Sequence, residues 1–170
     1  HAGARDAQTM AELADLYIYE ARVTGNEKYY YPAALRMLEH GLAEHPDNLE
    51  LLALKTRSLL AMHRFEEARQ LASRLITRSP RTAMFYGMLC DACVNQGDLD
   101  EAVRAVDAMI SIRPVVDSYA RVSHIREPHG DMAGALEAMH LAVQAVMQGT
   151  HDAAWTRTTY GQLLRKAGKE

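Results

Sequence analysis

The stretch between Pro80 and Pro114 decides the fold, and it reads PRTAMFYGMLCDACVNQGDLDEAVRAVDAMISIRP. Two runs rich in apolar residues flank the pair Gly97-Asp98, which is a turn signal. Glycine can adopt the left-handed backbone conformation that closes a helix, because it has no side chain to clash. Proline has no N–H group to donate and biases the residue before it away from helix, so both prolines are expected to end helices. The stretch therefore predicts a helix, a short turn, a second helix and a proline stop.

The same unit recurs along the chain at a constant spacing of 34 residues, marked by Pro46, Pro80 and Pro114. A small residue stands twelve positions before each proline: Ala34, Ala68 and Ala102. A bulky side chain at these places would hold the second helix of a pair away from the first. A fixed period of this length predicts helix pairs that stack on their neighbours, because one pair cannot bury its apolar face alone.

The pattern resembles the tetratricopeptide repeat (TPR) family, whose repeat reads W-x2-L-G-x2-Y…A-x3-F…P. The best copy matches at Tyr86, Leu89, Cys90, Cys93, Ala102, Val106 and Pro114. The preceding copy matches at Leu52, Thr56, Leu59, Phe65, Ala68 and Pro80, with His63 in place of the turn glycine. The following copy matches at Tyr119, Val122, Ser123, Gly130, Ala135 and Met139, without the final proline. The resemblance implies an all-α, right-handed superhelical solenoid of antiparallel helix pairs.

We expect one TPR-like domain over residues 1–170, with four helix pairs and a closing C-terminal helix. The expected repeats cover about residues 10–48, 49–82, 83–115 and 116–150, and the closing helix covers 151–168. The first repeat has four extra residues, which we expect to loop out around residues 26–31. Five of the eight tyrosines, at positions 17, 19, 29, 30 and 31, lie in the first fifth of the chain. We expect them to pack against the first helix pair, with a partner anchor as the alternative.

The resemblance implies a non-enzymatic scaffold that binds a peptide or a partner segment in a concave groove lined by the first helices. The candidate groove residues are Arg57, Met84, Met88, Asp91, Asn95, Arg121, His124 and Gln162. Methionines would give an adaptable apolar floor, and the polar residues would hold an extended backbone. Three alternatives stay open: a solvated face without a ligand, a self-assembly module that makes homo-oligomers, and a regulatory or interaction domain of a larger protein.

Composition argues against two classes of partner. The chain has 19 Lys and Arg against 22 Asp and Glu, a net charge of −3, so it lacks the basic surface that nucleic acid requires. No apolar run approaches the roughly 18 residues of a membrane-spanning helix, so we expect no membrane insertion. The first residue is His1, so a processed secreted or periplasmic form stays open, while cysteines that look reduced favour the cytoplasm.

No pattern in the sequence predicts a catalytic, cofactor or metal site. Cys90 and Cys93 have a spacing that suits a metal or a disulfide, but no further ligand pair accompanies them. Both coincide with inward-packing positions of the repeat, so we expect buried, inert thiols. The eight histidines form neither an HExxH motif nor a pair at i, i+4.

Overall fold

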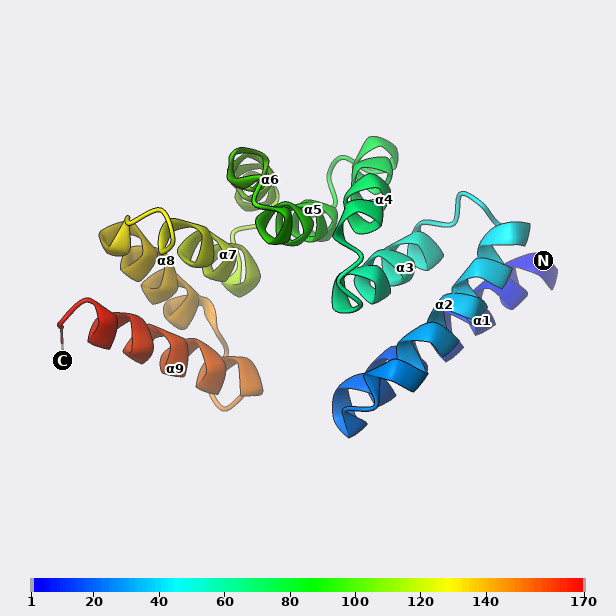
Figure 1. Cartoon of the computed structure of the whole chain (residues 1–170), viewed down its shortest axis with the longest axis horizontal. Helices are drawn as coiled ribbons and strands as arrows, with labels where there is room; N and C mark the ends of the chain where they lie inside the picture. Colours follow the sequence, from blue (N-terminus) through cyan, green and yellow to red (C-terminus); the bar gives the residue numbers. More distant parts are fainter. Residues whose placement is uncertain (1, 170) are drawn as a thin grey trace. The chain divides into compact units, whose positions relative to one another are not determined.

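The computed structural model describes residues 2–169, apart from the side chains of residues 2–5 and 151. This part of the chain forms nine helices and no strand (Figure 1). The helices are α1 (Ala2–Thr24), α2 (Glu27–Glu44), α3 (Leu49–Ala61), α4 (Phe65–Arg78), α5 (Ala83–Gln96), α6 (Leu99–Ile112), α7 (Val116–Arg126), α8 (Met132–Ala145) and α9 (His151–Lys166). The predicted all-α class, with antiparallel helix pairs and one closing helix, is confirmed.

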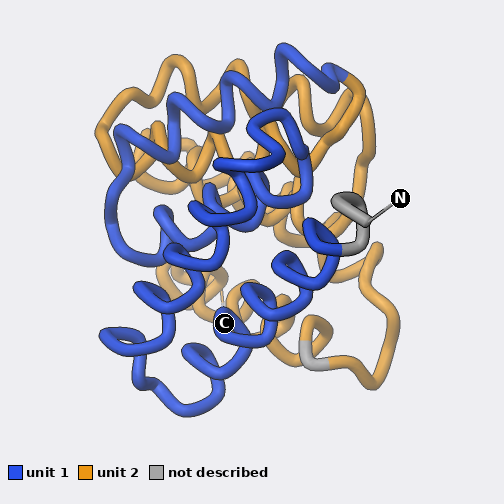
Figure 2. The backbone as a smooth tube through the Cα atoms, turned by 90° about the vertical axis from the view of Figure 1, so that its right-hand side faces the viewer, with its two compact units in different colours: residues 1–80 blue, residues 81–170 orange. Residues whose placement is uncertain are grey.

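The chain divides into two compact units, residues 1–80 and residues 81–170 (Figure 2). In the first unit, α1 packs on α2, α3 packs on α4, and α3 also contacts α1 and α2. In the second unit, the pairs α5–α6 and α7–α8 are joined by contacts of α7 with α5 and α6, and α9 packs on α8. Each unit therefore stacks helix pairs in chain order, as a helical repeat does.

Small residues lie where the two helices of a pair approach each other. Ala34, Ala68, Ala102 and Ala135 all have 0% exposed surface. The prediction that a large side chain could not occupy these positions agrees with their complete burial.

Short turns connect the helices at the predicted places. Gly97 and Gly130 adopt φ angles of 78° and 80°, in the left-handed region, directly after α5 and in the loop that follows α7. His63 takes the same conformation with φ of 59°, although it carries a side chain. The three period-marking prolines each lie two residues beyond the end of a second helix, at α2, α4 and α6. Backbone constraint therefore sets the helix boundaries.

The connection between α2 and α3 is tied to α4 by charge. The carboxylate of Asp47 accepts hydrogen bonds from Arg74 at 2.8 Å and from Arg78 at 2.7 Å. The bond from Arg74, which is the largest cause, lowers the pKa of Asp47 below its usual value, and Arg78 adds to this. The loop after Pro46 is thus held on the next helix pair.

The expected loop at residues 26–31 is wrong, because α2 already begins at Glu27 and continues through Pro32. The extra residues lengthen the helices of the first pair and do not form a separate loop. Tyr31 is 5% exposed and belongs to the core between α1 and α2, and the rings of Tyr30 and Tyr17 lie 6.3 Å apart. These tyrosines therefore pack within the first helix pair, and α2 continues through Pro32 although proline has no N–H to donate.

Candidate ligand-binding groove

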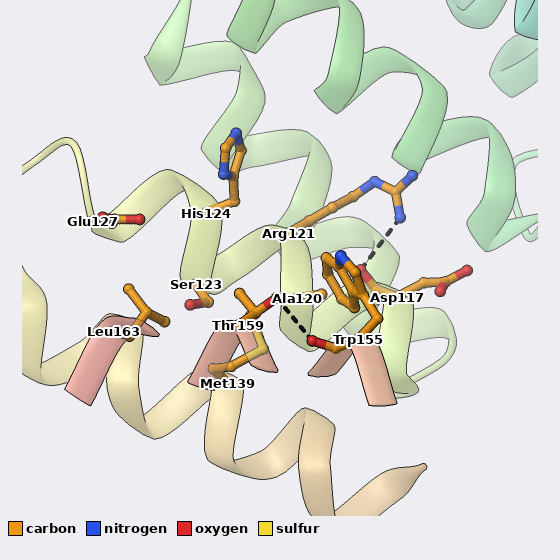
Figure 3. A pocket seen from close by; sticks show the side chains of 10 residues that line it. All are labelled: Asp117, Ala120, Arg121, Ser123, His124, Glu127, Met139, Trp155, Thr159 and Leu163. Carbon is orange, nitrogen blue, oxygen red and sulfur yellow. Dashed lines mark hydrogen bonds between the residues drawn. The ribbon is translucent and has the colours of Figure 1, made fainter. Parts of the chain in front are cut away.

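A cavity of about 360 Å³ lies between α7 and α9 in the second unit (Figure 3). It is lined by Asp117, Ala120, Arg121, Ser123, His124, Glu127, Met139, Trp155, Thr159 and Leu163. On α9, Trp155, Thr159 and Leu163 follow one another at intervals of four, which places them on one face of the helix. The volume is within the range of sites that hold small ligands or single large side chains.

The floor of this cavity is apolar, and its mouth carries an aromatic side chain. Ala120, Met139 and Leu163 are 9%, 2% and 3% exposed, so they belong to the core that α7, α8 and α9 share. Trp155 is 49% exposed and is the single tryptophan of the chain. A half-exposed tryptophan beside an apolar depression has surface to lose when a ligand binds.

One polar group in the wall of the cavity lacks a partner. Ser123 is 1% exposed, and its Oγ makes no hydrogen bond. Other buried hydroxyls of the described chain bond to main-chain carbonyl oxygens, as Thr56 does to Leu52 at 2.8 Å and Thr156 to Asp152 at 2.8 Å. A buried hydroxyl without a partner is uncommon, and it calls for a reason.

The charged residues around the mouth are largely paired with one another. Arg121 donates from Nε to Oδ1 of Asp91 at 2.8 Å and from Nη2 to Oδ2 at 2.7 Å, and it also bonds the carbonyl of Asp117. Burial is the largest single cause and lowers the pKa of the Arg121 guanidinium, but the hydrogen bonds and charge of Asp91, with smaller contributions from Cys90 and Asp117, together leave this pKa raised. Glu127, directly after α7, pairs with Lys166 of α9. Little free charge is left at the mouth of the cavity.

A smaller cavity of about 100 Å³ lies between α5 and α7. Its lining comprises Cys90, Asp91, Val94, Asn95, Arg121, His124 and Ile125. Arg121 and His124 line both cavities, so they form a ridge between them. We call the two cavities with this ridge the α5–α7–α9 groove.

Half of the predicted groove residues lie in the lining of this groove, namely Asp91, Asn95, Arg121 and His124. Met88 differs from its predicted place, because it is 4% exposed and its side chain is part of the core. Met84 and Gln162 are exposed on α5 and α9 but line neither cavity. Arg57 belongs to the first unit, where it pairs with Asp15 of α1 at 3.3 Å.

Sequence reasoning missed the residues that give the larger cavity its character. Ser123 and Met139 match the small and the apolar position of the repeat, which marks them as packing residues. Leu163 lies in the closing helix, where the repeat pattern is incomplete. Of these residues only Trp155 could have been found from the sequence, since it stands at a position that lines the inner wall in the resembled family.

The two cysteines are core residues, as predicted. Cys90 and Cys93 are reduced and are 1% and 0% exposed. Burial raises the pKa of the Cys90 thiol to about 12, with a smaller contribution from Asp91. Among the side chains that the structure describes (residues 6–150 and 152–169), no group of His, Cys, Asp and Glu is arranged to hold a metal ion. Within the same residues, no helix combines the length and apolarity needed to span a membrane.

The fold and its groove define a helical-repeat protein. The family model for the tetratricopeptide repeat matches residues 30–86. The match shows a tetratricopeptide repeat within residues 30–86, and the described part of the chain has an all-α, TPR-like fold. No curated protein sequence matches the chain significantly.

Solved structures share this fold at low sequence identity. The thermophilic TPR protein TTC0263 from Thermus thermophilus is 20% identical, with a TM-score of 0.79 over 96% of this chain and 84% of that one. MamA from Desulfovibrio magneticus RS-1 is 14% identical, with a TM-score of 0.67 over 92% and 86%. The Yersinia enterocolitica type III secretion chaperone SycD, solved with a peptide of the translocator YopD, is 17% identical, with a TM-score of 0.66 over 73% and 96%.

Proposed function

We propose that this protein is a non-enzymatic scaffold that binds an extended segment of a partner protein in the α5–α7–α9 groove. The observation that carries the proposal is the cavity between α7 and α9, which combines an apolar floor with the half-exposed Trp155. Binding sites for protein segments take their affinity from such buried pockets with aromatic anchors. The similar chaperone SycD was solved with a peptide, which supports the same use of the fold here.

The groove suits an extended chain better than a helix. First helices of neighbouring repeats pack about 8–10 Å apart, and an extended chain in the polyproline II conformation advances about 3.1 Å per residue with three residues per turn. Side chains three residues apart lie on the same side of such a chain, so they would enter the two cavities, a large one between α7 and α9 and a small one between α5 and α7. The exposed ring of His124 can donate to or accept from the backbone of the segment, and the amide oxygen of Asn95 can accept from it.

The proposal is tested by selecting peptides from a displayed random library on the whole protein and measuring their affinity by calorimetry. We expect Trp155→Ala to weaken binding by about tenfold or more, because a central tryptophan contributes strongly to such interfaces. Leu141→Ala is the matched control, since Leu141 is a 38% exposed apolar residue on α8 outside the groove. Selected peptides that bind both variants equally well would place the site elsewhere, and a selection that yields no binder would refute the proposal.

A second candidate function is self-assembly, and α1 provides the observation that favours it. Leu16, Tyr19 and Val23 are 55%, 60% and 62% exposed, and their spacing places them on one face of α1. A terminal helix of a repeat array needs a polar outer face to stay monomeric. Sedimentation velocity at rising protein concentration, with Leu16→Glu as the variant, tests this function. A wild type that stays monomeric throughout would exclude it.

A third candidate, an interaction domain within a longer protein, would use the same groove. The binding experiment above therefore applies to it without change.

A further inference from the structure

We propose that the cavity between α7 and α9 takes a tyrosine side chain of the partner segment, with the phenol hydroxyl bonded to Ser123 Oγ. This inference rests on the proposed function, because it names the residue that the groove recognises. The argument starts from the hydroxyl of Ser123, which is 1% exposed, has no partner and lines this cavity.

The unpaired hydroxyl distinguishes Ser123 from every other buried polar residue of the described chain. The remaining four, Thr56, Ser58, Ser118 and Thr156, each donate to a main-chain carbonyl oxygen. A buried hydroxyl left unsatisfied costs free energy, whereas a ligand that supplies a partner recovers it. A serine hydroxyl can both donate and accept, so a second hydroxyl is a suitable partner.

The charges around the cavity exclude a charged ligand tip at its floor. Arg121 is already bonded through Nε and Nη2 to Asp91, and Glu127 is paired with Lys166. An ionised carboxylate or ammonium group on the apolar floor would be buried without a counter-charge, which is costly. Asp117 and His124 are exposed at the mouth, so they do not compensate a charge at the floor.

The residues that line the cavity favour an aromatic ring as the group that carries the neutral hydroxyl. Met139 and Leu163 form an apolar floor, and Trp155 stands above it on α9 (Figure 3). Sulfur–aromatic contacts and offset or edge-on ring pairs are favourable here. Serine and threonine are too short to fill about 360 Å³. Phenylalanine fits the floor but leaves the Ser123 hydroxyl unpaired. Tyrosine and tryptophan both carry a neutral donor on an aromatic ring, but only the tyrosine hydroxyl can, like that of Ser123, both donate and accept, so we take tyrosine as the residue.

The test compares N-acetyl-tyrosinamide with N-acetyl-phenylalaninamide as probes on the whole protein. Because Trp155 is the single tryptophan, its indole N–H gives one NMR resonance that reports on this cavity. We expect wild type to bind the tyrosine amide about three- to tenfold more tightly than the phenylalanine amide. In Ser123→Ala the ratio should fall to about one. Ser111→Ala, at an exposed serine of α6, should keep the wild-type ratio.

The Ser123→Ala variant also provides its own folding control. Removing a buried hydroxyl without a partner should leave the melting temperature equal or higher, so a lost preference cannot be attributed to unfolding. A ratio of one in wild type, or an unchanged preference in Ser123→Ala, would overturn the tyrosine assignment. If library peptides bind the groove without any such preference, only this inference fails. If no peptide binds at all, the proposed function fails with it.

Discussion

The ion pair between Arg121 and Asp91 should stabilise the second unit measurably, and a double-mutant cycle measures by how much. The pair joins α7 to α5 through two hydrogen bonds of 2.7 and 2.8 Å. The two side chains are 28% and 38% exposed, so water screens the interaction only partly. Exposed ion pairs contribute about 0–1 kcal/mol, and well-formed bonds between charged groups about 1.5–3 kcal/mol. We therefore expect a coupling free energy of about 1–2 kcal/mol.

The pair Arg64–Glu67 is the matched control within the same chain. It also has two hydrogen bonds, each of 2.6 Å, but it lies three residues apart at the start of one helix. Its side chains are 40% and 51% exposed, so its coupling should be about 0.3–0.5 kcal/mol.

The assay is urea unfolding of wild type, each single alanine variant and the double variant, followed by far-UV circular dichroism and by Trp155 fluorescence. The fluorescence reports on the second unit, which contains the single tryptophan. High salt should reduce the coupling of the control pair proportionally more, because it is more exposed. A coupling for Arg121–Asp91 equal to that of Arg64–Glu67 would refute the reasoning that this pair joins two repeats.

Three further predictions concern the two units. Cys90, whose thiol pKa is about 12, should resist a thiol reagent at pH 8 in the folded protein and react promptly only in urea. A prompt reaction without urea would contradict the burial of this thiol. In Asp47→Asn the melting temperature should fall less steeply with decreasing pH than it does in wild type. The bond from Arg74 lowers the pKa of Asp47, so its contribution is present above the unfolded pKa and is lost as the pH falls through the folded one. Gly97→Ala should lower the free energy of unfolding by about 1 kcal/mol, because φ is 78° at this position. Gly161→Ala, at an exposed position inside α9 with open space around it, should raise the free energy of unfolding by about 0.5–1 kcal/mol. Equal effects in urea unfolding would contradict this.

The helix boundaries could be predicted because they depend on backbone constraint, which single residues reveal. At the repeat positions a proline follows the end of a second helix and a glycine closes a first one, so Pro80, Pro114 and Gly97 were sufficient to locate three ends. Pro32 lacks that register and lies inside α2. The four extra residues of the first repeat could not be placed in the same way. Counting shows that residues are added, but only the burial of Tyr31 against α1 decides that they extend a helix.

The candidate groove could be predicted only in part, because four of the eight predicted residues line it and the pairing between them could not be foreseen. Repeat register places Asp91 and Arg121 on first helices, yet it does not reveal that they bond to each other across 30 residues of sequence. The bond lies close to Gly87, where a Cβ would be 3.3 Å from the Arg121 guanidinium carbon, which is tighter than an ordinary contact. The missing side chain on α5 thus leaves room for the charge on α7, and sequence spacing carries no sign of it.

The specificity of such a groove depends on which of its polar groups are left after the protein has paired its own. Taken as a set of residues, the groove is rich in charge and would suit an acidic or a basic ligand equally. Once Arg121 is bonded to Asp91 and Glu127 to Lys166, the remaining groups are exposed side chains at the mouth and one buried hydroxyl at Ser123. Charged groups at an exposed mouth are screened and discriminate weakly between ligands. A buried group without a partner discriminates strongly, because every ligand either satisfies it or leaves it unpaired.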